Sequence, residues 1–434
     1  MDQTCPLDLV AQIAQPVCSI VLTKSPAATV DATIVKRLPI HTEKMPSTVP
    51  VEPKLIRWAI TRSGLTEDEL REKFKKLDEW ISGDRQPTFR QLEEFARKTM
   101  TPFGFLFLKE PPVEDLKIPD FRTVGDTPIK RLSPNLIETM QTMKSRQEWM
   151  KDLLLDDDQQ ELDFVGSAAN SKNHKTVAQK IRQTLELAPN WAESAGNWED
   201  ALQLLRGSIE QAGILVFSNS VVGLNNTRPL DPEEFRGFVF CDPYAPLIFV
   251  NSADSKSAQM FTLAHELAHI WLGVDGLFNL VRMLPHSDKT ERFCNKVAAE
   301  FLVPEYKLRE RWEEATATNK PFVKIGKWFK VSPVVAARRA LDLKLIGQVT
   351  FFRFYEENQK QWQKVKRERK KKPGGNFYAT QDSRLSRRFT STVVRATREG
   401  RMLYRDAYKL TGLRGDTYSK FAGHVLNRIR NERQ

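Results

Sequence analysis

Two histidines four positions apart constrain the fold of this chain more than any other feature of its sequence. They belong to the run His265-Glu266-Leu267-Ala268-His269, inside an apolar stretch that favours a helix and ends at Gly273. Because one helical turn takes 3.6 residues, the two imidazoles lie on the same face of that helix and can reach one metal ion. We therefore predict a buried helix over residues 257–273 that carries half of a metal site.

The residue between the two histidines suggests the chemistry. A catalytic zinc ion takes three protein ligands, keeps a fourth position for water and lowers the pKa of that water to about 7. Glu266 directly follows the first histidine, so its carboxylate can take a proton from the water without binding the metal. We predict a Zn²⁺ ion held by His265 and His269, with Glu266 as the general base.

The third ligand must come from another part of the chain. The next predicted helix reads E-R-F-C-N-K-V-A-A-E-F-L-V and stops before Pro304. Its Glu291 can complete a site of two histidines and one glutamate, and we predict it as the third ligand. Glu300 on the same helix competes for this role, but we interpret it as a structural or surface carboxylate. His286, in the loop between the two helices, is a weaker candidate for a metal or transition-state role.

Length and composition limit the number of domains and the cellular compartments that fit this chain. Its 434 residues suffice for two or three domains, and no apolar run approaches the roughly 18 to 20 residues of a membrane span. Asp2 and Asp8 stand where a signal peptide would be basic. The four cysteines form no CxxC pair, which favours a reducing compartment over a zinc or disulfide role for Cys5 and Cys18. We predict a cytoplasmic protein with no membrane partner.

The order of elements predicts an α+β chain that is mainly helical, with a small antiparallel sheet. A strand follows Gly213, and two β-rich runs at Gly237–Cys241 and Leu247–Val250 form a hairpin. Helices are expected around 176–187, 197–211, 386–398 and 404–410. We divide the chain into a poorly ordered leader with a short strand at Ser19–Thr23 (1–48), a helical module (49–110), a connector and an amphipathic helix from Pro134 (111–170), a catalytic domain (171–347) and a basic helical C-terminal region (348–434).

Two segments together resemble the ImmA/IrrE family of bacterial metallopeptidases. The segments are FTLAHELAHIWLG and the following ExxCNxxAAEFLVP, and the likeness extends over about residues 176–347. Cys294 and Val297 stand where alanine and phenylalanine are common in the family, and both changes suit a core.

The resemblance to this family implies a zincin-like fold, zinc ligands His265, His269 and Glu291, and catalytic Glu266. It also implies a protein substrate, namely a transcriptional repressor or a partner regulator encoded nearby, in a stress, mobile-element or toxin–antitoxin setting. Arg338 and Arg339 in the helix that follows suit an acidic partner or a surface ion pair.

The module over residues 53–108 resembles the XRE type of helix-turn-helix regulator. Thr66 and Glu69 form a capping box, and Thr88 begins another helix. The likeness rests on GLTEDEL, on W-x-S-G-x-x-x-P at Trp80–Pro87 and on TFRQLEEFA. However, the recognition helix is short and carries Asp78 and Glu79 where DNA readers carry basic or amide side chains. The module therefore either binds DNA or has degenerated into a docking unit for a protein.

The net charge of +12 is concentrated near the C-terminus, above all at Lys364–Lys372. Such a run is either a solvated connector or a non-specific contact for phosphates. We expect any DNA binding to be weak, salt-sensitive and largely non-specific.

Two further questions stay open at this level. The alternative to a peptidase is a non-catalytic regulatory binding protein, an antitoxin or a transcription factor, that uses the peptidase fold as a partner platform. If the chain is a peptidase, the run Ala245–Asn251 before the metal helix either supplies a sheet edge for an extended substrate or is purely structural.

Overall fold

The structure is a computed structural model that describes residues 47–112, 132–278, 289–368 and 377–432, with residues 361–368 and 379 described by their backbone alone. The predicted leader, with its strand at Ser19–Thr23 and its Cys5 and Cys18, lies outside these ranges. So do His286 and the end of the basic run. Among the described helices, none combines the length and the apolarity of a membrane span.

The N-terminal module consists of short helices with clear end signals. They are α1 (Pro53–Ser63), α2 (Glu67–Lys73), α3 (Leu77–Ser82), α4 (Phe89–Lys98) and the 3₁₀ turn η2 (Phe103–Phe107). Gly64 and Gly83 end α1 and α3 in the left-handed conformation, with φ of 69° and 90°, which favours glycine. Thr66 and Thr88 each form the two reciprocal bonds of a capping box. The helix starts predicted at Thr66 and Thr88 are confirmed, and the apolar faces of these elements share a small core around Leu55, Trp80 and Phe95.

A four-stranded sheet lies at the centre of the larger part of the chain. Its strands are β1 (Leu215–Asn219), β5 (Leu247–Asn251), β4 (Gly237–Phe240) and β6 (Gly276–Phe278), in that order across the sheet. β4 and β5 pair antiparallel, which confirms the hairpin. A separate antiparallel pair joins β2 (Val221–Val222) to β3 (Asn225–Pro229).

Two details of the sheet correct the sequence-based expectations. The sheet is mixed and not wholly antiparallel, because β1 pairs with β5 in parallel. β5 also has a neighbour on each side, β1 and β4, so its hydrogen-bonding edges are both occupied. The run Ala245–Asn251 is therefore structural, and the idea that it offers an edge to a substrate was wrong. The outer strands of this sheet are β1, next to β5, and β6, next to β4.

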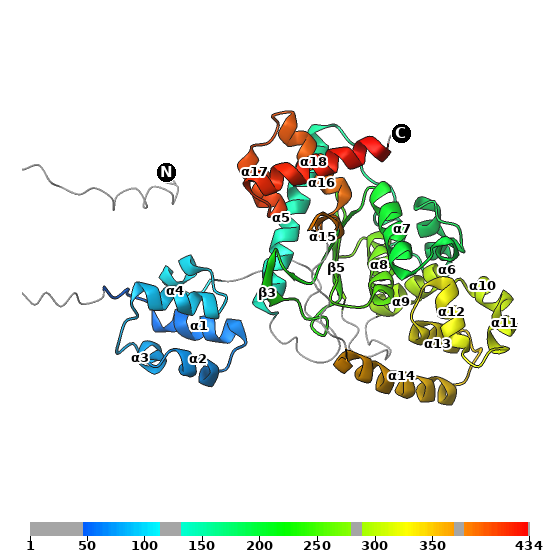
Figure 1. Cartoon of the computed structure of the whole chain (residues 1–434), viewed down its shortest axis with the longest axis horizontal. Helices are drawn as coiled ribbons and strands as arrows, with labels where there is room; N and C mark the ends of the chain where they lie inside the picture. The colour runs from blue at the N-terminus through cyan, green and yellow to red at the C-terminus, as the bar shows by residue number, and fades with distance from the viewer. Residues whose placement is uncertain (1–46, 113–131, 279–288, 369–376, 433–434) are drawn as a thin grey trace, which may run out of the picture. The chain divides into compact units, whose positions relative to one another are not determined.

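Helices enclose both faces of the sheet (Figure 1). Chain order gives α5 (Pro134–Asp156), α6 (His174–Thr184), η3 (Trp191–Ser194), α7 (Trp198–Gln211), α8 (Lys256–Leu272), α9 (Lys289–Leu302), α10 (Glu305–Glu310), α11 (Trp312–Thr316), α12 (Pro321–Phe329), α13 (Pro333–Asp342), α14 (Gln348–Glu368), α15 (Phe377–Arg384), α16 (Arg387–Arg398), α17 (Tyr404–Thr411) and α18 (Gly415–Glu432). These helices confirm the expectation of a mainly helical chain with a small sheet.

The alternation of strand side chains divides the interior into two cores. On β1 and β5, Val216, Ile248 and Val250 point to the face covered by α7, α8 and α9. Their neighbours Phe217 and Phe249 point to the opposite face, which is covered by α5 and by the C-terminal helices α16, α17 and α18. The C-terminal region is therefore packed against the sheet and completes one of its two cores.

Candidate metal centre

Helix α8 places both histidines at the centre of the first core. Ser255 caps its start by accepting a hydrogen bond from the amide of Ala258 at 3.3 Å, and Gly273 ends it with φ of 72°. The helix is apolar on nearly all sides, so it is buried along most of its length. His265 and Glu266 are fully buried, and His269 is 2 % exposed.

Helix α9 brings Glu291 to the two histidines. Its Oε2 atom lies 3.1 Å from Nε2 of His265, and its Oε1 atom lies 3.2 Å from Nε2 of His269. The two Nε2 atoms are 3.1 Å apart. Within the described residues, these three side chains form the group of possible ligands whose atoms all lie within 4.8 Å of one another. The structure thus brings together the three residues that the sequence predicts as ligands.

The spacing of these atoms fits a small divalent cation. Ligand atoms bound tetrahedrally at about 2 Å from zinc are about 3.3 Å apart, close to the separations of the Nε2 and carboxylate atoms. Two imidazoles and a carboxylate are also a usual donor set for a catalytic zinc site. The side chain of Glu291 is 21 % exposed, whereas the histidines are buried, so solvent reaches the group from the side of Glu291.

The charges of the three residues suit a cation as well. Burial opposes ionisation of Glu291, but the neighbouring His265 and His269 still lower its pKa, so the carboxylate is negative. Burial lowers the pKa of His265 and favours its neutral form. Burial also acts to lower the pKa of His269, but Cys294 and Glu291 beside it raise that pKa overall. Because a cation competes with a proton on an imidazole, metal binding should weaken as the pH falls.

Glu266 stands apart from the three ligands. Both of its carboxylate oxygens are buried, and neither has a hydrogen-bond partner among the described residues. Burial raises the pKa of Glu266 to about 8. Burial of a carboxyl group without hydrogen-bond partners lowers the stability of the fold. Such a group is therefore typical of a catalytic or ligand-binding position, and this residue is the strongest sign of function in the site.

Two glycines allow the sheet to approach the metal helix closely. A Cβ atom on Gly237 of β4 would lie 2.4 Å from Cγ2 of Thr262 and 3.2 Å from Oε1 of Glu266. A Cβ atom on Gly276 of β6 would lie 2.9 Å from Cε1 of His269. Real side chains do not approach so closely, so these two glycines fix how near the strands lie to the catalytic face of α8.

One residue of the site was missed from the sequence. The other ring nitrogen of His265, Nδ1, lies 3.1 Å from Oδ1 of Asn295. Such a contact orients a metal-binding imidazole and selects its tautomer. Asn295 follows Glu291 by four positions, which places both side chains on one face of α9. That spacing was visible in the sequence and is the signal that could have identified Asn295.

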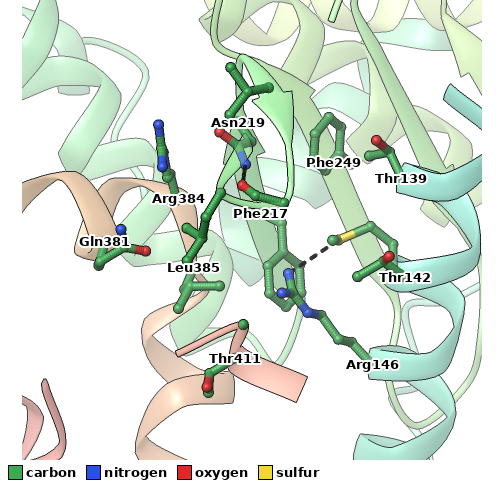
Figure 2. A pocket seen from close by; sticks show the side chains of 15 residues that line it. Thr139, Thr142, Arg146, Phe217, Asn219, Phe249, Gln381, Arg384, Leu385 and Thr411 are labelled. Carbon is green, nitrogen blue, oxygen red and sulfur yellow. Dashed lines mark hydrogen bonds between the residues drawn. The ribbon is translucent and has the colours of Figure 1, made fainter. Parts of the chain in front are cut away.

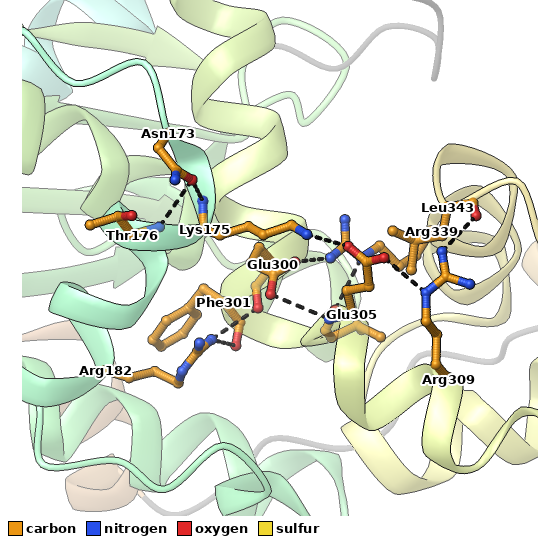
Figure 3. Close-up of polar contacts among 11 residues, drawn as sticks. Asn173, Lys175, Thr176, Arg182, Glu300, Phe301, Glu305, Arg309, Arg339 and Leu343 are labelled. Atoms are coloured by element: carbon orange, nitrogen blue, oxygen red, sulfur yellow. Dashed lines mark hydrogen bonds and ion pairs between the residues drawn. The ribbon is translucent and has the colours of Figure 1, made fainter.

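Glu300, the competing ligand candidate, has a different partner. Its carboxylate forms a buried ion pair with Arg339 of α13, and its Oε1 also accepts a hydrogen bond from the amide of Glu305 at 3.3 Å. Arg182 of α6 donates to the backbone carbonyls of Glu300 and Phe301, at 2.9 and 3.2 Å (Figure 3). Glu300 is therefore a structural carboxylate that ties α9 to its neighbours.

Comparison with known proteins identifies the type of domain. Residues 209–341 match the family described as the IrrE N-terminal-like domain, Peptidase M78. A stretch of 96 residues is 34% identical to the radiation response metalloprotease IrrE of Deinococcus radiodurans. Residues 385–424 match a family described as a domain of unknown function, DUF8813.

The chain thus contains an IrrE N-terminal-like metalloprotease domain with a possible metal site at its His-His-Glu group. The similarity is confined to part of each protein. The matched stretch covers 21% of this chain, and it spans 29% of the length of the Deinococcus protein.

Proposed function

We propose that this chain is a zinc-dependent endopeptidase that cleaves a transcriptional repressor or a partner regulator. The observation that carries the proposal is the buried carboxylate of Glu266, which has no hydrogen-bond partner in the described part of the chain and stands beside a His-His-Glu group with the spacing of a metal site. The IrrE N-terminal-like domain around it supports the same chemistry.

In this proposal, His265, His269 and Glu291 hold a zinc ion, which would act as a Lewis acid on the peptide carbonyl and activate the attacking water. Glu266 takes the proton from that water and passes it to the nitrogen of the leaving amine. Asn295 keeps the ring of His265 in the tautomer that leaves Nε2 available. The apolar surroundings of Glu266 raise its pKa, so its ionised carboxylate is a stronger base than an exposed one.

The substrate is proposed to bind as an extended strand. β6 lies at one edge of the four-stranded sheet, and its Gly276 lies against the ring of His269. A peptide that pairs with this edge would run past the metal group with its backbone held by the strand. We propose a regulator encoded near this chain as the substrate, in a stress, mobile-element or toxin–antitoxin setting in the cytoplasm. The free thiols of Cys241 and Cys294 fit a reducing compartment.

A second candidate function is a regulatory binding protein without catalysis. The N-terminal helical module, with its own core, favours this possibility, because such a unit can dock a protein or DNA. Asp78 and Glu79 on α3 form ion pairs with Arg71 and Arg85, at 3.0 and 3.4 Å. This acidic helix is poorly suited to reading bases, so we propose that any DNA binding is weak and non-specific and involves the basic run at Lys364–Lys372.

The test is co-expression of the chain with the regulator encoded beside it, as wild type and as Glu266→Gln. A peptidase should yield a cleavage product with the wild type and none with Glu266→Gln, while Glu313→Gln, at an exposed position, serves as the matched control. A stable complex with an uncleaved regulator in all three samples would favour the non-catalytic function. Metal analysis of the same preparations should find about one zinc per chain.

A further inference from the structure

A second site of interest lies in the other core, on the sheet face that points away from α8. A small pocket of about 50 Å³ opens there between α5 and α15. Phe217 of the edge strand β1 and Phe249 of its neighbour β5 form its apolar floor, and Thr411 at the end of α17 closes one side (Figure 2). This volume has room for a few water molecules or a small anion.

The pocket contains a buried positive charge. Arg146 of α5 is 7 % exposed, and its guanidinium lies 5.0 Å from the ring centre of Phe217. Its Nε donates to the carbonyl of Leu410 at 2.8 Å, and Nη1 contacts the sulfur of Met143 at 3.8 Å. Burial lowers the pKa of Arg146 to about 10, and no carboxylate forms an ion pair with it in the part of the chain that the structure describes.

Other buried arginines of the chain are better satisfied. Arg182 donates to two backbone carbonyls, and Arg206 donates to the carbonyls of Ser383 and Val216. Arg339 has the carboxylate of Glu300. Arg146 has one carbonyl, a thioether and the wall of an open pocket. Because a buried ion normally has a counter-ion or a full set of hydrogen bonds, Arg146 has capacity left for a partner.

Two residues of α15 add to this capacity. Arg384 lines the same pocket, and burial lowers its pKa, with no ion pair to a described carboxylate. Gln381 is 2 % exposed, and its Oε1 atom has no hydrogen-bond partner among the described residues. The pocket therefore offers two cations and a buried amide oxygen that can accept a hydrogen bond.

The remaining polar groups of the wall are already used as donors. Thr139, Thr142 and Thr411 donate their hydroxyl groups to carbonyls of their own helices, at 2.7, 2.8 and 2.7 Å. Asn219 donates to the carbonyl of Gly223 at 2.7 Å. A ligand would thus meet guanidinium donors and otherwise acceptors, above an aromatic floor.

We propose that this pocket binds a small oxyanion, either a carboxylate or a phosphate, that also carries a hydrogen-bond donor. Arg146 and Arg384 are the two cations available to the oxyanion at different parts of the wall, and Oε1 of Gln381 accepts the donor. This site is separate from the proposed peptidase chemistry and does not depend on it. It is nevertheless connected to the metal helix, because β5 passes along the pocket floor and leads through residues 252–255 into α8.

The test is a calorimetric titration of the purified full-length chain, with malonate and with inorganic phosphate as separate probes at constant ionic strength. We expect millimolar or tighter binding of at least one probe, and the two probes distinguish a carboxylate site from a phosphate site. Arg384→Gln should weaken binding about tenfold or more, because a charge-assisted hydrogen bond is lost. Arg398→Gln, an exposed arginine on α16, is the matched control and should leave the affinity unchanged.

Arg146→Met should weaken binding at least as much as Arg384→Gln. Circular dichroism shows whether this variant is folded, and if it is not, Arg384→Gln decides by itself. The proposal is wrong if the wild type binds neither probe. It is equally wrong if Arg384→Gln binds as tightly as Arg398→Gln, since the contact would then lie elsewhere on this basic chain.

Discussion

The buried arginines Arg339 and Arg146 lie in the two cores on opposite faces of the sheet, and their surroundings differ. Arg339 is 4 % exposed and meets the carboxylate of Glu300, so its charge is neutralised within the fold. Arg146 is 7 % exposed and meets aromatic rings, one carbonyl and an open pocket. The first arginine holds helices together, whereas the second has capacity left for a ligand.

The same contrast holds between two glutamates of the first core. Glu300 and Glu266 are both buried glutamates of the first core, at 4 % and 0 % exposure. Glu300 has an ion pair and a backbone donor, and the oxygens of Glu266 have no described partner. A buried ionisable side chain with a complete set of partners indicates a structural role. One without such partners indicates a role in catalysis or in ligand binding. The four predictions that follow test this distinction, from the largest effect to the smallest.

The largest effect is expected for Glu266→Gln. Loss of a general base typically lowers the rate by about 10² to 10⁴ fold, so peptide cleavage should fall by that amount. Zinc content should not change, because Glu266 is not a ligand. Stability should be equal or higher, because the variant replaces a carboxylate whose ionised form is disfavoured by burial.

Kinetic assays on the regulator, metal analysis and urea unfolding measure these three properties. Oxyanion affinity of the second pocket is a further readout and should equal that of the wild type. Cleavage at the wild-type rate in Glu266→Gln would remove this residue from the mechanism.

The next largest effect is expected for Glu300→Ala. This change leaves the guanidinium of Arg339 buried without its partner, and the free energy of unfolding should fall by about 3 to 5 kcal/mol. The double variant Glu300→Leu/Arg339→Met should recover much of this loss, because it leaves no buried charge. Arg146→Met should destabilise less than Glu300→Ala, since it leaves no charge unpaired.

Chemical denaturation measures all of these variants. Metal content separates the two glutamates of α9: Glu291→Ala should lose zinc, and Glu300→Ala should keep it under conditions where it is folded. The opposite order would make Glu300 the ligand and Glu291 the structural residue.

Local signals allowed much of this architecture to be predicted from the sequence. Helix α8 was predicted from its apolar run and Gly273, and its two histidines from their spacing. Glu291 was predicted as a ligand from its place near the start of the next helix, and the structure brings it within 3.2 Å of both imidazoles. The capping box at Thr66 and the helix start at Thr88 were also predictable from local sequence, because a capping box involves residues only three positions apart.

Long-range pairing was not predictable in this way. The parallel pairing of β1 with β5 joins segments about thirty residues apart, and neither segment contains a sequence signal that indicates its partner strand. The partner of Glu300 is 39 positions away on α13. The second pocket is formed by α5, β1, α15 and α17, which are spread over most of the chain. Its lining depends on tertiary packing, so no single sequence motif predicts it.

A third prediction concerns the close contact between β4 and α8. In Gly237→Ala the new methyl group would lie 2.4 Å from Cγ2 of Thr262 and 2.9 Å from the carbonyl oxygen of Phe249. Because the nearest atoms include backbone, the strand must move, and overpacking of this kind typically costs about 1 to 3 kcal/mol. Cleavage should fall as well, since the movement displaces the wall beside Glu266.

Gly207→Ala is the matched control for this prediction. Gly207 lies within α7, and a Cβ atom there would meet no atom within 4 Å. This control should be stabilised by up to about 1 kcal/mol, because alanine favours a helix over glycine. Thermal and urea unfolding of both variants give the comparison. Equal stability of the two would mean that β4 tolerates a side chain at this contact.

The smallest effect is expected at the surface, where pairing matters least. Glu305 of α10 accepts from Lys175 of α6 at 2.6 Å and from Arg309 at 2.8 Å (Figure 3). These contacts lower its pKa from 4.5 to about 2. A carboxyl group whose pKa is lowered by folding stabilises the fold above its unfolded pKa and loses that contribution as the pH falls toward its folded pKa. Glu305→Gln should therefore lower the free energy of unfolding by about 1 kcal/mol at pH 7, the usual size for an exposed ion pair.

The difference between wild type and Glu305→Gln should shrink as the pH is lowered from about 6 to about 3.5, since Glu305 takes up a proton in the unfolded chain while it is still ionised in the folded chain. It should also shrink in high salt, which screens exposed charges and leaves the buried pair of Glu300 and Arg339 nearly unaffected. Urea unfolding across this pH range measures both trends, with Glu313→Gln as the control at an exposed position. A difference that stays constant with pH and salt would mean that Glu305 stabilises the chain by packing, and the contrast between exposed and buried pairs would then fail at this position.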